Sequence, residues 1–280
     1  MIKAKKSLGQ NFLTDARISR RIIEAVSPQQ SDIILEVGPG LGALTRLLVE
    51  RSGCVIAVEI DSRLAAELRR SISSDNLSII EADALTVNWD ELINSGIASW
   101  KAAGRGDGDE PRVRVVANLP YYISTPIIER LIQLRSRVHD LTLMLQSEVV
   151  ERMTSGPGGR DYGYLSVHVQ YYCVVTKLFE VPPSAFRPAP KVQSAIVKLD
   201  VRDRPAVDVA DEARFFALVR AAFAQRRKTI LNNLKAAQGT LPFARPIEAA
   251  LDAAGVDSKR RAETLSLAEF AALNAALFAQ

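Results

Sequence analysis

The stretch that decides the fold is DIILEVGPGLG, residues 32–42. A largely apolar run of six residues is followed at once by glycines at positions 38, 40 and 42. Such a run is typical of a strand buried in a parallel sheet, and glycines after it permit a tight turn with backbone N–H groups close to a ligand. The spacing is G-x-G-x-G and not the G-x-G-x-x-G of dinucleotide sites. Taken alone it also fits a purely structural turn.

Four further apolar runs extend this pattern and predict buried parallel strands, at residues 54–59, 77–80, 113–117 and 141–145. Helix-like stretches lie at 41–52, 61–73 and 124–135. Alternation of strand and helix predicts an α/β fold with a doubly wound sheet. Two later runs, at 173–181 and 192–201, predict an antiparallel pair that closes the sheet.

The composition changes near residue 200, and we predict two domains, 1–200 and 201–280. Residues 200–211 are polar and are interpreted as a linker, whereas the Gly- and charge-rich segment 95–112 predicts a surface loop. Beyond the linker the chain predicts a small all-helical domain. Its first helix has an apolar stripe, and further helices are expected at 226–236, 246–254 and 267–279.

Composition excludes several classes of protein. The 280 residues include two cysteines, which give neither a disulfide framework nor a zinc site, and we expect no bound metal and a reducing, cytoplasmic location. No apolar run approaches the roughly 18–20 residues that span a bilayer, so no membrane partner is expected. Cys54 and Cys173 lie in apolar runs and are predicted to be small core residues.

Basic residues gather near both ends of the chain. Residues 1–21 carry six Lys and Arg against one acid, and Arg226-Arg227-Lys228 lies in a segment, 221–236, without any acid. A single run of this kind is usually a solvated face. Two such patches favour a polyanionic partner.

Two acids fall where parallel strands end. Glu59 ends the second strand, 21 residues after Gly38, where a carboxylate can accept both hydroxyls of a ribose. Asp83 follows the third strand and could accept from an adenine amino group. Either acid could instead cap a helix. Together with the glycine turn they favour an adenosyl ligand.

The fourth strand ends in Asn118-Leu119-Pro120-Tyr121. An exocyclic adenine amine is a poor nucleophile because its lone pair is delocalised into the ring. The side-chain oxygen of Asn118 and the backbone carbonyl of Leu119 could each accept an N6–H, which favours a tetrahedral nitrogen. Pro120 fixes the turn and removes a competing N–H donor, and Tyr121 offers a face to the base. These residues predict an enzyme that methylates an exocyclic amine.

Several ordered motifs resemble the ribosomal RNA adenine N6,N6-dimethyltransferase family. They are GQNFL (9–13), LEVGPGLGALT (35–45), VEID (58–61), ADAL (82–85), NLPYYIST (118–125), FRPAPKVQSAIVKL (186–199) and QRRKTILNNL (225–234). The likeness is greatest to the small-subunit (16S) enzymes, which dimethylate two adjacent adenosines near the 3′ end of that RNA. The macrolide-resistance enzymes of large-subunit RNA are the alternative. Tyr122 departs from the family, in which many members carry Asn.

The resemblance implies a Rossmann-like class I methyltransferase sheet, the cofactor S-adenosyl-L-methionine and the small ribosomal subunit with its RNA as partner. It assigns cofactor contacts to Asn11, Leu13, Gly38, Glu59, Asp83 and Asn118. Phe186 is implied to stack on the base opposite Tyr121, and the prolines around it predict an exposed ring. Lys5, Lys6, Arg226, Arg227 and Lys228 are candidate RNA contacts, and we expect a monomer.

Two other classes remain open at this point. A small-molecule methyltransferase would share the first three motifs but has no use for the basic patches. A ribosome-assembly factor could keep the fold without catalysis, although Glu59 and the intact turn at 118–121 count against the loss of activity.

Overall fold

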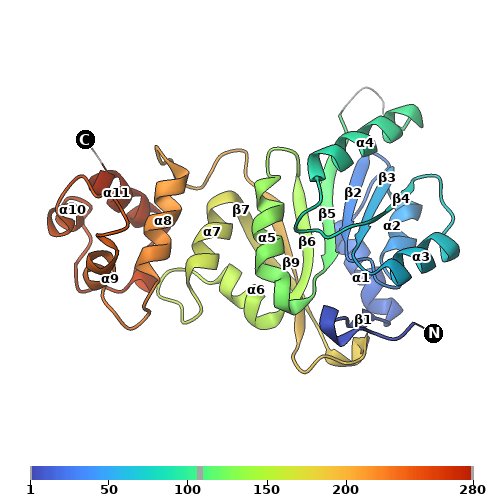
Figure 1. Ribbon diagram of the computed structural model, residues 1–280, viewed down its shortest axis with the longest axis horizontal. Coiled ribbons are helices and arrows are strands. Elements are labelled where there is room, and N and C mark those ends of the chain that lie inside the picture. The colour runs from blue at the N-terminus through green and yellow to red at the C-terminus, as the bar shows by residue number, and fades with distance from the viewer. Residues whose placement is uncertain (1, 106–109, 279–280) are drawn as a thin grey trace. The chain divides into compact units, whose positions relative to one another are not determined.

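The computed structural model describes residues 2–105 and 110–278, without the side chain of Lys6 (Figure 1). Its main element is a seven-stranded sheet with the order β4-β3-β2-β5-β6-β9-β7. The strands are β2 (Asp32–Val37), β3 (Cys54–Glu59), β4 (Leu77–Glu81), β5 (Arg112–Asn118), β6 (Asp140–Gln146), β7 (Cys173–Val181) and β9 (Ser194–Val201). The mostly parallel α/β sheet predicted from the apolar runs is confirmed.

The first five of these strands are parallel, and β9 runs antiparallel to β6. Chain order within the sheet reverses at β2, because β3 lies on one side of it and β5 on the other. In open α/β sheets such a switch point is where ligands bind, beyond the carboxyl ends of the strands. The fold therefore directs attention to the loops that follow β2, β3, β4 and β5.

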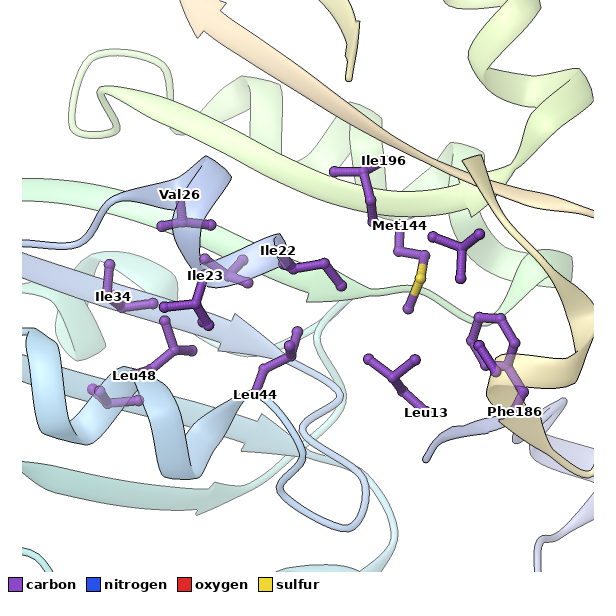
Figure 2. Packing of buried hydrophobic residues seen from close by; sticks show 14 residues of the cluster. Leu13, Ile22, Ile23, Val26, Ile34, Leu44, Leu48, Met144, Phe186 and Ile196 are labelled. Atoms are coloured by element: carbon purple, nitrogen blue, oxygen red, sulfur yellow. The ribbon is translucent and has the colours of Figure 1, made fainter. Parts of the chain in front are cut away.

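Helices cover both faces of the sheet. On one face Ile34 of β2 packs with Ile22 and Ile23 of α1 (Figure 2), whereas on the other Ile33 lies against Gly96 of α4. The helices of this part are α1 (Ala16–Val26), α2 (Thr45–Arg51), α3 (Ser62–Ser71), α4 (Trp89–Ala102), α5 (Ser124–Gln133) and α6 (Ser147–Thr154), with short 3-10 turns η1 (Lys6–Leu8), η2 (Tyr121–Ile123) and η3 (Pro183–Ala185). A two-stranded ribbon pairs β1 (Phe12–Leu13) with β8 (Phe186–Arg187).

Helices α1, α4 and α6 were not predicted from the sequence. The predicted surface loop 95–112 is wrong for its first eight residues, because α4 continues to Ala102. Trp100 is buried, and its indole N–H donates to the Gln30 carbonyl at 2.9 Å. Tertiary packing thus overrides the low helix propensity of the Gly and Ser residues here. Residues 106–109 of the predicted loop lie outside the described part of the chain.

The chain divides into two compact units, and the division differs from the predicted one in a single segment. One unit comprises Met1–Val150 and Thr176–Val201, and the other Glu151–Val175 and Arg202–Gln280. The first unit ends at Val201, one residue beyond the predicted boundary, and residues 151–175 group with the C-terminal helices. The predicted linker, 200–211, begins two residues too early, because β9 continues to Val201; residues 202–211 contain neither helix nor strand.

Aromatic packing explains this grouping. In the second unit Tyr171 of α7 (Tyr164–Tyr172) lies 5.3 Å, between ring centroids, from Phe215 of α8 (Glu212–Ala222). His168 lies 4.8 Å from Phe216 in the same cluster. The remaining elements are α9 (Ile230–Ala237), α10 (Ile247–Ala253), the 3-10 turn η4 (Ala262–Thr264) and α11 (Leu267–Phe278). The predicted apolar stripe of α8 is confirmed, since its inward residues are buried.

Two observations bear on the excluded classes. Within the described ranges, no helix has both the length and the apolar character that a membrane span requires. Cys54 and Cys173 are both buried, as expected for core residues.

A buried ion network joins the central strands at their amino-terminal ends. Arg114 of β5 donates through Nε to Asp140 of β6 at 2.8 Å and through Nη1 to Asp32 of β2 at 3.0 Å. All three residues are at most 5% exposed. Arg112 also reaches Asp32, at 3.0 Å, but nearly half of its side chain is exposed. The network stands at the sheet end opposite the switch-point loops and fixes three neighbouring strands.

We predict that Arg114→Met lowers the free energy of unfolding by about 3–5 kcal/mol, because it leaves buried carboxylates without their cation. Arg112→Met is the matched control and should cost at most about 1 kcal/mol, since that arginine is half-exposed. Urea unfolding midpoints of the two variants test this. Equal losses of unfolding free energy in the two variants would show that the buried position of Arg114 does not give it a larger contribution to stability.

Candidate functional site

A cavity of about 320 Å³ opens at the switch point. This volume lies within the range of small-molecule sites. Five segments contribute its walls: residues 8–13, the loop after β2, the ends of β3 and β4 with the residues that follow them, and the turn 118–123. All six predicted cofactor residues line it, together with Leu119, Pro120 and Tyr121. The topology thus brings together positions more than a hundred residues apart in sequence.

The glycine turn forms the floor of this cavity. Gly38 has a φ of 67° and Gly40 a φ of 61°, a left-handed backbone that favours glycine. The Gly40 N–H donates to Glu59 Oε2 at 3.1 Å, and the Asp61 N–H donates to Glu59 Oε1 at 2.9 Å. Both oxygens of Glu59 are therefore fixed in place, and each keeps a lone pair for a ligand. Burial raises the pKa of the Glu59 carboxyl above its ordinary value.

Asp83 and Asn118 lie further along the cavity wall. Asp83 Oδ1 accepts from the Leu85 N–H at 2.9 Å, so the carboxylate shapes the loop after β4. The Asn118 side-chain N–H donates to the Asn11 carbonyl at 3.4 Å. That contact turns the nitrogen of Asn118 toward the N-terminal segment and leaves the side-chain oxygen as an acceptor.

Tyr121 is held by a hydrogen bond and Tyr122 is exposed. The hydroxyl of Tyr121 lies 2.6 Å from Ser194 Oγ, and burial raises the pKa of this phenol. Tyr122 is 59% exposed, and both rings border the cavity. A Cβ at Gly9 would lie 3.0 Å from the Tyr122 ring, so the two residues lie in close contact.

The expectation that Phe186 is exposed is wrong. Its ring is 1% exposed and packs in the core beside Leu13 and Met144 (Figure 2). Strand β8 pairs antiparallel with β1, with Leu13 opposite Phe186. The prolines stiffen this segment as predicted, but they direct the ring inward. In this conformation Phe186 offers no face to a base, and it anchors the N-terminal segment.

The candidate RNA contacts have different environments. Lys5 forms an ion pair with the buried Asp61 at 3.1 Å, whereas the side chain of Lys6 lies outside the described part of the structure. Arg226, Arg227 and Lys228 are all exposed. They do not begin a helix, as the sequence predicted, because α9 starts only at Ile230 after the Thr229 cap. The basic run therefore lies on the loop between α8 and α9.

Sequence reasoning gave no role to Glu36, which also lines the cavity. Its carboxyl is buried, and Oε2 has no hydrogen-bond partner among the described residues. Burial raises the pKa of Glu36 to about 8, and the nearby charge of Glu59 acts in the same direction. The available signal was an acid that follows three consecutive apolar residues near the carboxyl end of β2. Within the described ranges, no cluster of His, Cys, Asp and Glu side chains could hold a metal ion.

We predict that Glu36→Gln stabilises the protein more at pH 8 than at pH 5. An unfolded Glu ionises near pH 4.5, whereas the folded carboxyl ionises only near pH 8, so the parent loses stability as pH rises between these values. The slope is at most about 1.4 kcal/mol per pH unit. Thermal unfolding of parent and variant across this range measures the difference. A difference independent of pH would show that Glu36 is ionised in the folded protein.

Known proteins are similar to this chain over nearly its whole length. The family model described as "Ribosomal RNA adenine dimethylase" matches residues 1–273. The protein named "Ribosomal RNA small subunit methyltransferase A" from Moorella thermoacetica is 49% identical over 275 residues, which are 98% of this chain and 92% of that protein. The protein of the same name from Geobacillus thermodenitrificans is 45% identical over 278 residues, 98% of this chain and 90% of its own.

Solved structures give the same result. A dimethyladenosine transferase from Plasmodium falciparum aligns with a TM-score of 0.74 and 29% identity, over 94% of this chain and 95% of its own. The 23S rRNA methyltransferase ErmE aligns with a TM-score of 0.69 and 28% identity, over 95% of this chain and 99% of its own. With the family model matched over residues 1–273 and relatives that are 45% and 49% identical, the chain belongs to the ribosomal RNA adenine dimethylase family.

Proposed function

We propose that this chain dimethylates N6 of two adjacent adenosines near the 3′ end of small-subunit ribosomal RNA, with S-adenosyl-L-methionine as methyl donor. One observation carries the proposal: the Asn118-Leu119-Pro120-Tyr121 turn borders the same cavity as Glu59 and Asp83. An amine-recognising turn thus adjoins carboxylates suited to an adenosyl group.

The cavity fits the methyl donor by its chemistry. Glu59, with both oxygens oriented by backbone N–H groups, would accept from the ribose hydroxyls, and Asp83 would accept from the adenine amine. Gly38 brings the backbone close to the ligand, and Asn11 and Leu13 would close the other side. The unpartnered oxygen of Glu36 suits a ligand that carries positive charge. When bound, the donor supplies a methyl group on a sulfonium, which is a good leaving group.

The chain's own residues prepare the amine. The Asn118 oxygen and the Leu119 carbonyl would accept the two N6–H groups, which localises the nitrogen lone pair toward the methyl group. Tyr121, fixed by Ser194, would support the base by stacking, worth about 1–3 kcal/mol. The methylated amine is acidic enough to release its proton to water. No residue is therefore asked to act as a general base.

The choice of RNA rests on relatives. The small-subunit enzymes named above are 45–49% identical to this chain, against 28% for the 23S rRNA methyltransferase ErmE. The alternatives are a large-subunit adenine N6-methyltransferase of the macrolide-resistance type and an assembly factor without catalysis. Unmethylated small subunits, large subunits and naked RNA, each incubated with labelled S-adenosylmethionine, distinguish the three. Label at two adjacent adenosines of the small subunit is expected, and label confined to large-subunit RNA, or none, would overturn the proposal.

We predict that Asn118→Ala reduces methyl transfer by at least about a hundredfold, since it removes one of two N6–H acceptors in a buried site, with a penalty of about 3 kcal/mol. Asn94→Ala, at an exposed position of α4, is the control and should keep parental activity. Unfolding curves verify that both variants fold. Ordinary turnover by Asn118→Ala on a substrate that the parent methylates would refute this mechanism.

The basic run on the α8–α9 loop is the second element of the proposal. Arg226 donates to the Arg160 carbonyl at 2.5 Å, a contact within the same unit that leaves its charge unneutralised. Arg227 and Lys228 are exposed beside it, and the nearest residues in sequence include no acid. Such a cluster suits RNA phosphates, which position an RNA without reading its sequence.

We predict that replacing Arg226, Arg227 and Lys228 with Ala weakens binding to the ribosomal substrate and lowers the log–log salt slope by roughly 2–3. The matched control replaces Arg202 and Arg204, which are exposed but adjacent to Asp203. Binding of S-adenosylmethionine should be unchanged in both variants. A parental salt slope in the triple variant would make the cluster an ordinary solvated face.

A further inference from the structure

The N-terminal segment 5–13, here called the arm, is fastened by one buried carboxylate. Lys5 Nζ donates to Asp61 Oδ1 at 3.1 Å, and the side-chain amide of Gln10 donates to Asp61 Oδ2 at 3.1 Å. The Lys5 backbone N–H donates in turn to Gln10 Oε1 at 2.8 Å. Asp61 thus accepts from two arm residues more than fifty positions away in sequence, and the arm residues brace one another.

The environment of Asp61 makes its contacts with the arm strong. It is 1% exposed and caps the N-terminus of α3, where its carboxylate also accepts from Arg63 at 2.6 Å. The Arg63 hydrogen bond, followed by those of Gln10 and Lys5, holds the pKa of Asp61 well below its usual range. The carboxylate is therefore charged at neutral pH. Leaving a buried charge without its partners is costly, which opposes detachment of the arm.

The fastening point is directly connected to the cavity. The Asp61 backbone N–H donates to Glu59 Oε1, the carboxylate assigned to the ribose. Residues 8–13 of the arm line the cavity, and the Asn11 carbonyl accepts from the Asn118 side chain. The other end of the arm is tied down by the β1–β8 pairing. Between these two attachments the arm forms one wall of the cavity.

We propose that Asp61 is a positioning residue that fastens the arm across the cofactor cavity, and that Lys5 and Gln10 set the residence time of the cofactor instead of binding RNA. This inference rests on the proposed function, because it takes the ligand of the cavity to be S-adenosylmethionine. It reassigns Lys5 from the RNA contacts that the sequence predicted. Lys5 keeps 41% of its side chain exposed, but its ammonium is directed to a carboxylate that is fully buried.

The test compares variants of three residues that donate to the Asp61 carboxylate: Lys5, Gln10 and Arg63. Lys5→Met and Gln10→Leu remove arm contacts, whereas Arg63→Met removes a contact that α3 makes with its own cap. The arm variants should release S-adenosylmethionine roughly tenfold faster, the effect expected when a charged hydrogen bond is lost. They should raise the KM for the cofactor more than they lower kcat. Arg63→Met should release it at the parental rate, and Lys5→Arg should restore slow release.

Other results would overturn the inference. If Arg63→Met speeds release as much as Lys5→Met, Asp61 acts only through the helix cap. If Lys5→Met leaves release unchanged but lowers the salt slope of RNA binding, Lys5 is a phosphate contact. Hydrogen exchange of residues 8–13 in the ligand-free protein provides a readout independent of the cofactor. Faster exchange in the arm variants alone supports the fastening of the arm, whether or not the parent binds S-adenosylmethionine. Failure of the parent to bind S-adenosylmethionine would instead refute the proposed function.

Discussion

The carboxylate of Glu59 connects the parts of the site that the sequence separates. It accepts from the Gly40 N–H of the loop after β2 and from the Asp61 N–H at the start of α3. The Asp61 bond is local to the end of β3, whereas the Gly40 bond exists only because β2 and β3 are adjacent and parallel, so that their carboxyl ends meet at one sheet edge. Through Asp61 the same carboxylate is linked to the arm, and through Gly40 to the glycine turn. An altered register of β2 against β3 would therefore disturb every wall of the cavity at once.

The amino ends of the strands contribute to stability, whereas their carboxyl ends carry the candidate site. At the amino ends, the buried network pairs the Arg114 guanidinium with the carboxylates of Asp32 and Asp140 and fixes three strands. At the carboxyl ends, Glu36 keeps an unpartnered buried oxygen and Glu59 is buried beside it, an arrangement that destabilises the protein on its own. Buried acids with raised pKa values are typical of ligand sites. For Glu36 this cost is offset at the opposite end of the same strand, where Asp32 of β2 pairs with Arg114.

The sequence predicted those features that depend on local pattern and failed where tertiary contacts decide. Continuous apolar runs located β2 and β3 to the residue, and the same sheet edge brought Glu59, Asp83 and Asn118 together. Helix α4 was not predicted because its Gly and Ser residues have a low helix propensity. Burial of Trp100 and its hydrogen bond to the Gln30 carbonyl offset this propensity, and neither contact can be read from the local sequence. Phe186 was misplaced for a similar reason. Prolines indicate stiffness, but the direction of the ring depends on Leu13 and Met144, which are remote in sequence.

The buried position of Phe186 changes how the site must hold an adenine. Its backbone pairs with β1 and its ring packs in the core, so Phe186 and Arg187 hold one end of the arm while Asp61 holds the other. Aromatic surface at the cavity then comes from Tyr121, fixed by Ser194, and from the exposed Tyr122. Tyr122 replaces the Asn that many members of the family carry, and its ring lies against Gly9 of the arm. Movement of the arm would therefore alter the surroundings of this aromatic ring, which couples the hold on the cofactor to the surface available to the target base.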